Sequence, residues 1–142
     1  MAAYDLQRFL SAQETTYDTA LAEIKRGRKT SHWMWFIFPQ LAGLGLSEMN
    51  RRYAISSIGE ATAYLQHPIL GKRLREISLA VLQNTVADAY AIFGSPDERK
   101  LRSCMTLFAA IPDTNPVFQQ VLDRFYQGIH DTRTLELLKE ES

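Results

Sequence analysis

The chain has 142 residues, 46% of them hydrophobic, and its 16 basic residues balance its 16 acidic residues. A chain of this length and composition can bury the core of one domain without a disulfide or a structural metal, and its single cysteine cannot form an internal disulfide. The zero net charge disfavours general nucleic-acid binding. The longest apolar run, six residues at 33–38, is too short to span a membrane, and the N-terminus lacks signal-peptide features. We therefore expect one soluble, cytoplasmic domain over residues 1–142.

The first predicted helix covers residues 5–26. Its apolar side chains recur at helical spacing and form one stripe: Leu6, Phe9, Leu10, Tyr17, Leu21 and Ile24. Asp5 can cap the start of this helix, and Gly27 can end it in the left-handed conformation that glycine adopts without strain. Lys25 and Arg26 suit the negative end of the helix dipole.

Residues 28–46 follow no clean helical or strand period. Pro39, Gly43 and Gly45 disfavour a long regular element there. We expect a helix of one or two turns over residues 31–38, with Met34 and residues 36–38 in the core, followed by an irregular turn. A short buried strand is the alternative.

Further helices are marked by residues that typically begin them. These start signals are Ser47, the capping-box pair Ser57 and Glu60, Pro68, the Ser95-Pro96 sequence with its following acids, and Asn115 with Pro116. The signals at 95–98 predict a helix over residues 96–109, and Gly128 can end the next one. A last short helix holds Leu135 and Leu138. No strand alternation is apparent, so the predicted fold is all-α, a single compact domain of six or seven helices.

The block RKTSHWMWFIFPQLAGLG, residues 28–45, combines cations, a histidine, aromatic rings and glycines, which is more than a core requires. Its candidate ligand-binding residues are Arg28, Lys29, Ser31, Trp33, Trp35 and Gln40, and its candidate catalytic residue is His32. The cations can neutralise an anion, an indole can stack on a base or sugar, the amide can orient the ligand, and the imidazole can act as an acid or base near pH 7.

Each of these residue types also has a purely structural interpretation. Cations at a helix end complement the dipole, histidine and tryptophan pack into cores, and glycines form tight turns. Outside the block, Arg73 and Lys100 can complete a pocket for the same anion or can lie on solvated helix faces. The histidines lack metal-ligand spacing, Cys104 has no adjacent base, and no glycine-rich phosphate loop occurs, so we expect no metal, no cofactor and an inert thiol.

The sequence resembles the bacterial domain-of-unknown-function family 1810, some members of which carry the label calpastatin in error. The resemblance spans nearly the whole chain and lies in residues 5–13, 28–45, 53–74, 92–110 and 134–138. It implies an all-α fold and no established activity. The family pattern has Ser-Ser where this chain has Ser103 and Cys104, which further disfavours a thiol nucleophile.

Two functional hypotheses follow from these observations. The first is that the protein binds, or also processes, an anionic small molecule of nucleotide or sugar-phosphate type at residues 28–45. The second is a non-catalytic protein-protein interaction module, in which part of the aromatic run forms an exposed patch. Binding of single-stranded RNA is less favoured because the chain has no net positive charge. The sequence indicates neither a reaction nor an oligomeric state.

Overall fold

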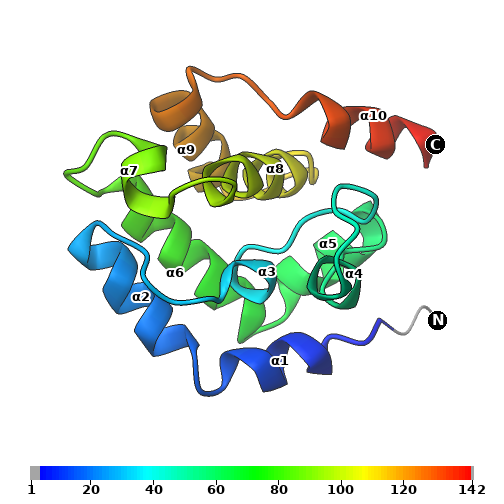
Figure 1. The fold of residues 1–142 in the computed structure, drawn as a ribbon. Helices are drawn as coiled ribbons and strands as arrows, with labels where there is room; N and C mark the ends of the chain where they lie inside the picture. Colours follow the sequence, from blue (N-terminus) through cyan, green and yellow to red (C-terminus); the bar gives the residue numbers. More distant parts are fainter. Residues whose placement is uncertain (1–3, 142) are drawn as a thin grey trace.

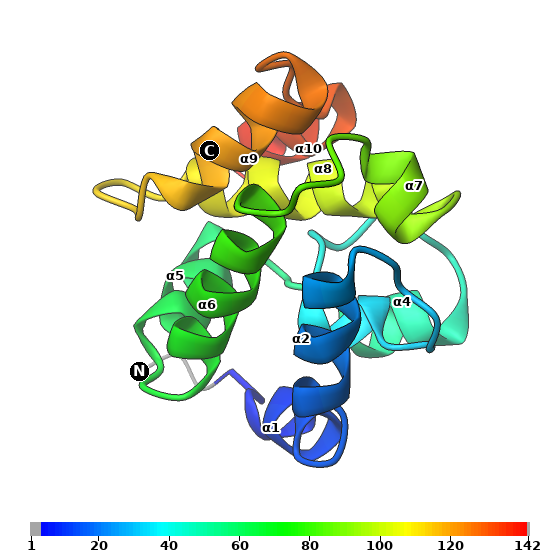
Figure 2. The same cartoon turned by 90° about the vertical axis from the view of Figure 1, so that its left-hand side faces the viewer.

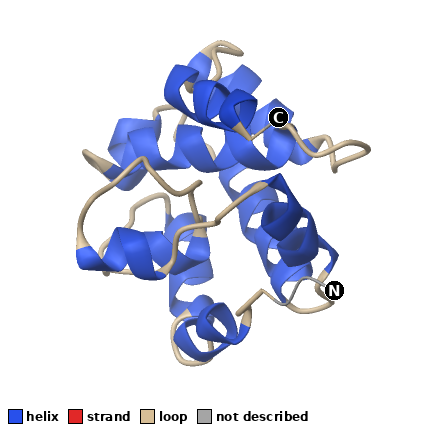
Figure 3. Ribbon diagram, turned by 90° about the vertical axis from the view of Figure 1, so that its right-hand side faces the viewer, coloured by secondary structure: helices blue, strands red, loops and turns tan. Residues whose placement is uncertain are grey.

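Ten helices follow one another along residues 4–141, the part of the chain described by the computed structural model (Figure 1). They are α1 (Gln7–Gln13), α2 (Tyr17–Arg26), α3 (Met34–Ile37), α4 (Glu48–Arg52), α5 (Ile58–Gln66), α6 (Leu70–Leu82), α7 (Ala89–Phe93), α8 (Asp97–Ala109), α9 (Val117–Tyr126) and α10 (Thr132–Glu140). Within these residues there is no β-strand, only one isolated bridge between Leu41 and Ile55 (Figure 3). The all-α prediction is confirmed. The predicted number of helices was wrong, since ten are present and seven of them have at least seven residues.

Part of this difference arises because the predicted 5–26 helix is broken after Gln13. The Gln13 side chain is buried, and its Nε2 donates to the Phe36 carbonyl at 2.7 Å and to the Tyr64 hydroxyl at 3.0 Å. The β-branched Thr15 and Thr16, which are weak helix formers, follow the break. As a result α2 runs in a different direction from α1 and packs against α6 (Figure 1). The predicted Asp5 cap was also wrong, because α1 has no side-chain cap.

Helix α7 was not predicted, whereas most of the predicted helix ends are present. Asp88 caps α7 by accepting a hydrogen bond from the Tyr90 amide at 3.0 Å. Ser47 and Ser57 cap α4 and α5 as expected. Gly27 ends α2 in the left-handed conformation, with φ of 87°. These features depend on neighbouring residues, which explains why the sequence indicated them.

The core forms around α8. This helix runs between α9 and α10 on one side and the layer containing α2, α5 and α6 on the other (Figures 1 and 2). Phe108 of α8 is fully buried and joins the layers, with ring centroids 5.6 Å from Tyr64 and 5.7 Å from Phe118. The longest helices, α6 and α8, have 13 residues each, and no described helix is long and apolar enough to cross a bilayer.

Residues 28–45 cross the molecule as two loops joined by α3. The predicted short helix is confirmed, although it occupies one turn only. The prediction that Met34 and residues 36–38 are core is also confirmed, since all four are at most 7% exposed. After α3 the chain is tied to the segment before α5, where Ala42 N donates to Ile55 O and Ile55 N donates to Gln40 O, each at 2.8 Å. This tie positions the loop of residues 42–47 beside α4.

Candidate functional site

The first half of the 28–45 block is organised by Glu23, a residue of α2 that is only 2% exposed. Its Oε1 accepts hydrogen bonds from Thr30 N (2.7 Å), Ser31 N (2.9 Å) and Trp33 Nε1 (3.0 Å), and its Oε2 accepts one from Ser31 Oγ (2.6 Å). Burial alone raises the pKa of the Glu23 carboxyl, but the hydrogen bonds outweigh burial and lower the pKa from its usual 4.5 to about 2. Ser31 and Trp33 are therefore both bound to a structural carboxylate.

Lys29 forms a second set of contacts in the 28–33 loop. Its Nζ donates to the Ser31 carbonyl at 2.6 Å and pairs with Asp97 Oδ2 at 2.9 Å. The ammonium also lies 5.0 Å from the centroid of the buried Trp33 ring. The Lys29 side chain is 8% exposed, so its charge is already neutralised at the start of α8. This contact fastens the 28–33 loop to α8.

Three other predicted residues lie away from this contact. Arg28 and His32 are exposed, and within the described residues neither side chain forms a hydrogen bond or an ion pair, nor lines one of the pockets below. Arg73 belongs to α6 and its side chain contacts α1 and α2: its guanidinium is 5.3 Å from the Tyr17 ring centroid, and Nη1 donates to Gln13 Oε1 at 3.3 Å.

The second half of the block borders two adjoining pockets, which together we term the Gln40 cleft. The inner pocket, of about 120 Å³, is lined by Trp35, Tyr53, Arg51, Leu41 and their neighbours. The outer pocket, of about 280 Å³, is lined by Arg99, Lys100, Ser103, Asp131, Arg133 and their neighbours. Gln40, Gly45 and Asn50 line both pockets and form the wall between them. The cleft therefore unites Trp35, Gln40 and Lys100 among the predicted residues.

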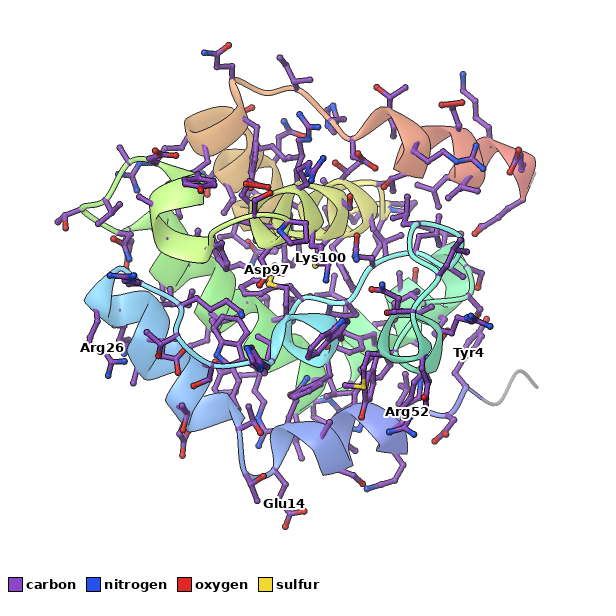
Figure 4. The ribbon with its side chains drawn as sticks, in the orientation of Figure 1. Tyr4, Glu14, Arg26, Arg52, Asp97 and Lys100 are labelled. Carbon is purple, nitrogen blue, oxygen red and sulfur yellow. The ribbon has the colours of Figure 1, made fainter. Side chains whose placement is uncertain are left out.

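The outer pocket carries an excess of positive charge. Within residues 4–141, Asp131 is the one carboxylate that lines it. Its Oδ2 is occupied in capping α10, where it accepts from Thr134 N at 3.0 Å and from Thr134 Oγ1 at 2.5 Å. Lys100 Nζ lies 3.7 Å from Asp97 Oδ1 and 5.4 Å from the Trp35 ring centroid, at the start of α8 above α3 (Figure 4). Arg99 and Arg133 form only long, exposed contacts with Glu98 (3.6 Å) and Glu136 (4.0 Å). Such surface pairs are weak, so the cations can turn to a ligand.

The wall between the pockets offers neutral hydrogen-bonding groups. The Gln40 side chain forms no hydrogen bond with any described residue. The Asn50 amide donates to Ser47 Oγ at 2.8 Å, while its oxygen accepts from no described group. Gly45 approaches Asn50 so closely that a Cβ at this position would lie 2.4 Å from Asn50 Nδ2. A side chain at residue 45 would therefore displace Asn50.

Metal-binding and thiol chemistry are not indicated in the part of the chain that the structure describes. No three His, Cys, Asp or Glu residues within it are grouped so that they can hold a metal ion. Cys104 is fully buried in α8, and burial raises the pKa of its thiol well above the usual value. A protonated, inaccessible thiol is a poor nucleophile.

Comparisons with known proteins give a family but no activity. A family model described as "Protein of unknown function (DUF1810)" matches residues 3–138. The chain belongs to the DUF1810 family. It is also similar to the conserved hypothetical protein Rv1873 from Mycobacterium tuberculosis, whose crystal structure is known. The identity is 49% over 96% of this chain and 97% of that chain, with a TM-score of 0.94. A comparison with curated proteins gives no match.

In this DUF1810 protein the sequence-predicted residues fall into separate regions. Glu23 binds Ser31 and Trp33, and Asp97 pairs with Lys29. The cleft is lined by Trp35, Gln40 and Lys100. The Arg73 side chain lies against α2. Sequence reasoning missed Glu23, Asn50, Arg99 and Arg133. A signal for Glu23 was present, because this carboxylate falls three residues after the buried Ala20 and next to Ile24 on the apolar stripe. The others have no local signal, since distant segments bring them together.

Proposed function

We propose that this DUF1810 protein binds an anionic small molecule in the Gln40 cleft. The observation that carries the proposal is the outer pocket, where three cations from α8 and α10 face one carboxylate already occupied as a helix cap. Arginine presents a planar set of donors that matches phosphate or carboxylate oxygens, and lysine adds a mobile point charge. Gln40 and Asn50 supply neutral contacts beside them.

The proposal keeps three of the residues expected from the sequence and adds Arg99, Arg133 and Asn50. Lys29 and Ser31 support the site indirectly, because their contacts hold the 28–33 loop against the helix that bears Lys100. Arg28, Trp33 and Arg73 have no contact with the cleft in this arrangement. A catalytic role for His32 stays a prediction, and we assign no reaction.

The alternative of a protein-interaction module has less support. An exposed aromatic patch requires several neighbouring rings at the surface. Among residues 33–38, however, only Trp35 exceeds 7% exposure. Trp35 itself lines the inner pocket and lies under Lys100. The aromatic run is therefore better placed to form one wall of a small-molecule site.

A thermal-shift screen tests the proposed function. The panel contains phosphate, citrate, sugar phosphates and nucleotides, and a ligand at 100 times its Kd stabilises the folded state by about 2.7 kcal/mol. For a domain of this size we expect an increase in Tm of several degrees, falling as salt is added because Arg99 and Arg133 are exposed. The K100Q/R133Q double variant should lose the shift.

The control variant is R26Q, because Arg26 is an exposed cation at the end of α2, far from Lys100 (Figure 4). It should respond to ligands as the wild type does. His32→Ala separates binding from chemistry, since it should keep the shift even if it abolishes turnover of the bound compound. No stabilisation by any anion, or equal stabilisation of the double variant, overturns the proposal.

A further inference from the structure

We infer that the ligand of the Gln40 cleft has two parts, a neutral planar heterocycle in the inner pocket and an anionic group in the outer pocket, which is the chemistry of a mononucleotide. The inference rests on the proposed function and names the class of ligand. It is drawn from the different linings of the two adjoining pockets: aromatic side chains line the inner pocket and cations line the outer pocket.

The inner pocket is suited to a neutral ring. Its volume of about 120 Å³ is several times the roughly 10–15 Å³ that one water molecule requires, so it can admit a group of ring size. Two aromatic side chains, Trp35 and Tyr53, line it together with the apolar Leu41. Aromatic side chains stack on nucleobases of any sequence because every base has a π-face.

The inner pocket also carries less charge than the outer pocket. Arg51 is its one ionisable cation, and the guanidinium is directed at the loop, where Nε and Nη2 donate to the Leu46 carbonyl at 2.9 and 2.6 Å. Among the described residues, no carboxylate lines this pocket. Three cations, Arg99, Lys100 and Arg133, line the outer pocket, so more of the positive charge of the cleft lies there than in the inner pocket.

The shared wall supplies side-chain amides that can form hydrogen bonds with the edge of a heterocycle. Side-chain amides carry both donors and an acceptor, and a nucleobase edge presents donors and acceptors next to one another. Gln40 has its whole amide free of described partners, and Asn50 keeps its oxygen and one N–H. Lys100 lies over Trp35 at the boundary, so an anionic group attached to a stacked ring would meet the cations of the outer pocket.

Calorimetric titration of the full chain tests the inference with compounds that contain one or both parts. The compounds are ribose 5-phosphate, the four nucleosides, the four nucleoside 5′-monophosphates and a short 5′-phosphorylated oligoribonucleotide. We expect at least one monophosphate to bind at least 10-fold tighter than ribose 5-phosphate, and its nucleoside to bind more weakly than the monophosphate. A 5′-phosphorylated oligoribonucleotide that binds more tightly than the monophosphate would instead indicate the end of an RNA strand and overturn a free nucleotide as the ligand.

The matched variants are W35L and L46A. Trp35 lines only the inner pocket, so W35L should reduce monophosphate affinity to that of ribose 5-phosphate and leave the affinity for ribose 5-phosphate unchanged. Leu46 lies on the same loop but is 80% exposed and lines neither pocket, so L46A should bind as the wild type does. In the wild type, a stacked base should quench indole fluorescence and ribose 5-phosphate should not, a result independent of how W35L folds.

The outcomes separate the two proposals. Equal affinity for ribose 5-phosphate and all four monophosphates, with no base-dependent quenching, overturns the heterocycle and leaves anion binding intact. If no anionic compound binds in either the thermal-shift screen or the titration, both the heterocycle and the anion-binding proposal are overturned.

Discussion

Glu23 shows how much one buried carboxylate can determine at the scale of single residues. It accepts four hydrogen bonds from three residues of the 28–33 loop, a segment with no regular structure of its own. Charge-assisted bonds of this kind are stronger than neutral ones, and they offset the cost of burying the charge. The position of Trp33 and the path of the chain toward α3 both depend on this residue.

Glu23→Gln should lower the free energy of unfolding by about 2–3 kcal/mol, because it removes the charge and directs an N–H₂ group at existing donors. Urea denaturation measures the change. Asp18→Asn is the control, since Asp18 is an exposed carboxylate on the same helix and its substitution should stay within about 0.5 kcal/mol. Equal effects of the two substitutions would contradict the role assigned to Glu23.

The low pKa of Glu23 also predicts acid sensitivity of the fold. Because folding lowers this pKa from 4.5 to about 2, the carboxylate stabilises the folded state above pH 4.5, and this stabilisation is lost as the pH falls toward 2. The shift corresponds to about 3 kcal/mol. Glu23→Gln should therefore lose less stability than the wild type between pH 5 and pH 2, which unfolding curves at several pH values can measure.

Residue-level reasoning from the sequence was right for the core and incomplete for the charges. Met34 and residues 36–38 are buried as their apolarity indicated. Lys29 is one of four cations clustered around the end of α2, yet it is the one that pairs with Asp97. The charge of a lysine does not indicate whether it is paired or solvated, because Asp97, the partner of Lys29, is nearly 70 residues away in the sequence.

At the scale of elements, helix starts were easier to predict than helix continuity. Ser57 Oγ accepts from Glu60 N at 3.1 Å, as the capping box requires, but Glu60 Oε1 accepts from Ser56 N rather than from Ser57 N. Its other oxygen pairs with Arg8 at 3.1 Å and thereby links α1 to α5. The Glu60 side chain of the capping box thus also forms a tertiary contact with α1. The break between α1 and α2 has the same origin, since the buried Gln13 amide bonds to residues of α5 and the end of α3.

The turn between α5 and α6 depends on the absence of a side chain at Gly71. A Cβ at this position would lie 1.9 Å from the Leu65 carbonyl oxygen, which is backbone and cannot move aside without shifting a helix. Gly71→Ala should therefore destabilise the protein by about 3 kcal/mol, as overpacked sites do. Lys72→Ala, at the adjacent exposed position, should be nearly neutral in the same denaturation experiment. A neutral Gly71→Ala would contradict close packing of residue 71 against the end of α5.

At the scale of the whole molecule, α8 joins the core to the cleft. Its buried face carries Leu101, Cys104, Met105 and Phe108, whereas its first turns present Asp97, Arg99 and Lys100 to the 28–45 block and the outer pocket. The Gln40 cleft is therefore supported by the most deeply packed helix of the domain. A site on such a support keeps its geometry when ligand is absent, which lowers the entropic cost of binding.

Cys104 provides a measure of the stability of this core. Its thiol is fully buried and its pKa is raised by burial, so a thiol reagent should react only after the domain unfolds. We expect labelling in native buffer to be at least about 1,000-fold slower than in urea, given the usual stability of such domains. Gly71→Ala should accelerate native labelling. Rapid labelling of the native wild type would show that α8 opens locally and would contradict a single cooperative core.

The sequence alone determined the helical class, the caps at Ser47 and Ser57, the left-handed stop at Gly27 and the buried run after Trp33, because each depends on residues within a few positions of one another. It also determined the family, because the matching segments are read along the chain without knowledge of the fold. Only the tertiary structure decided which cations are already paired and which line a cleft. The cleft joins residues 35–54 to residues 96–133, and their approach results from the packing of α8 and α10 rather than from any local pattern.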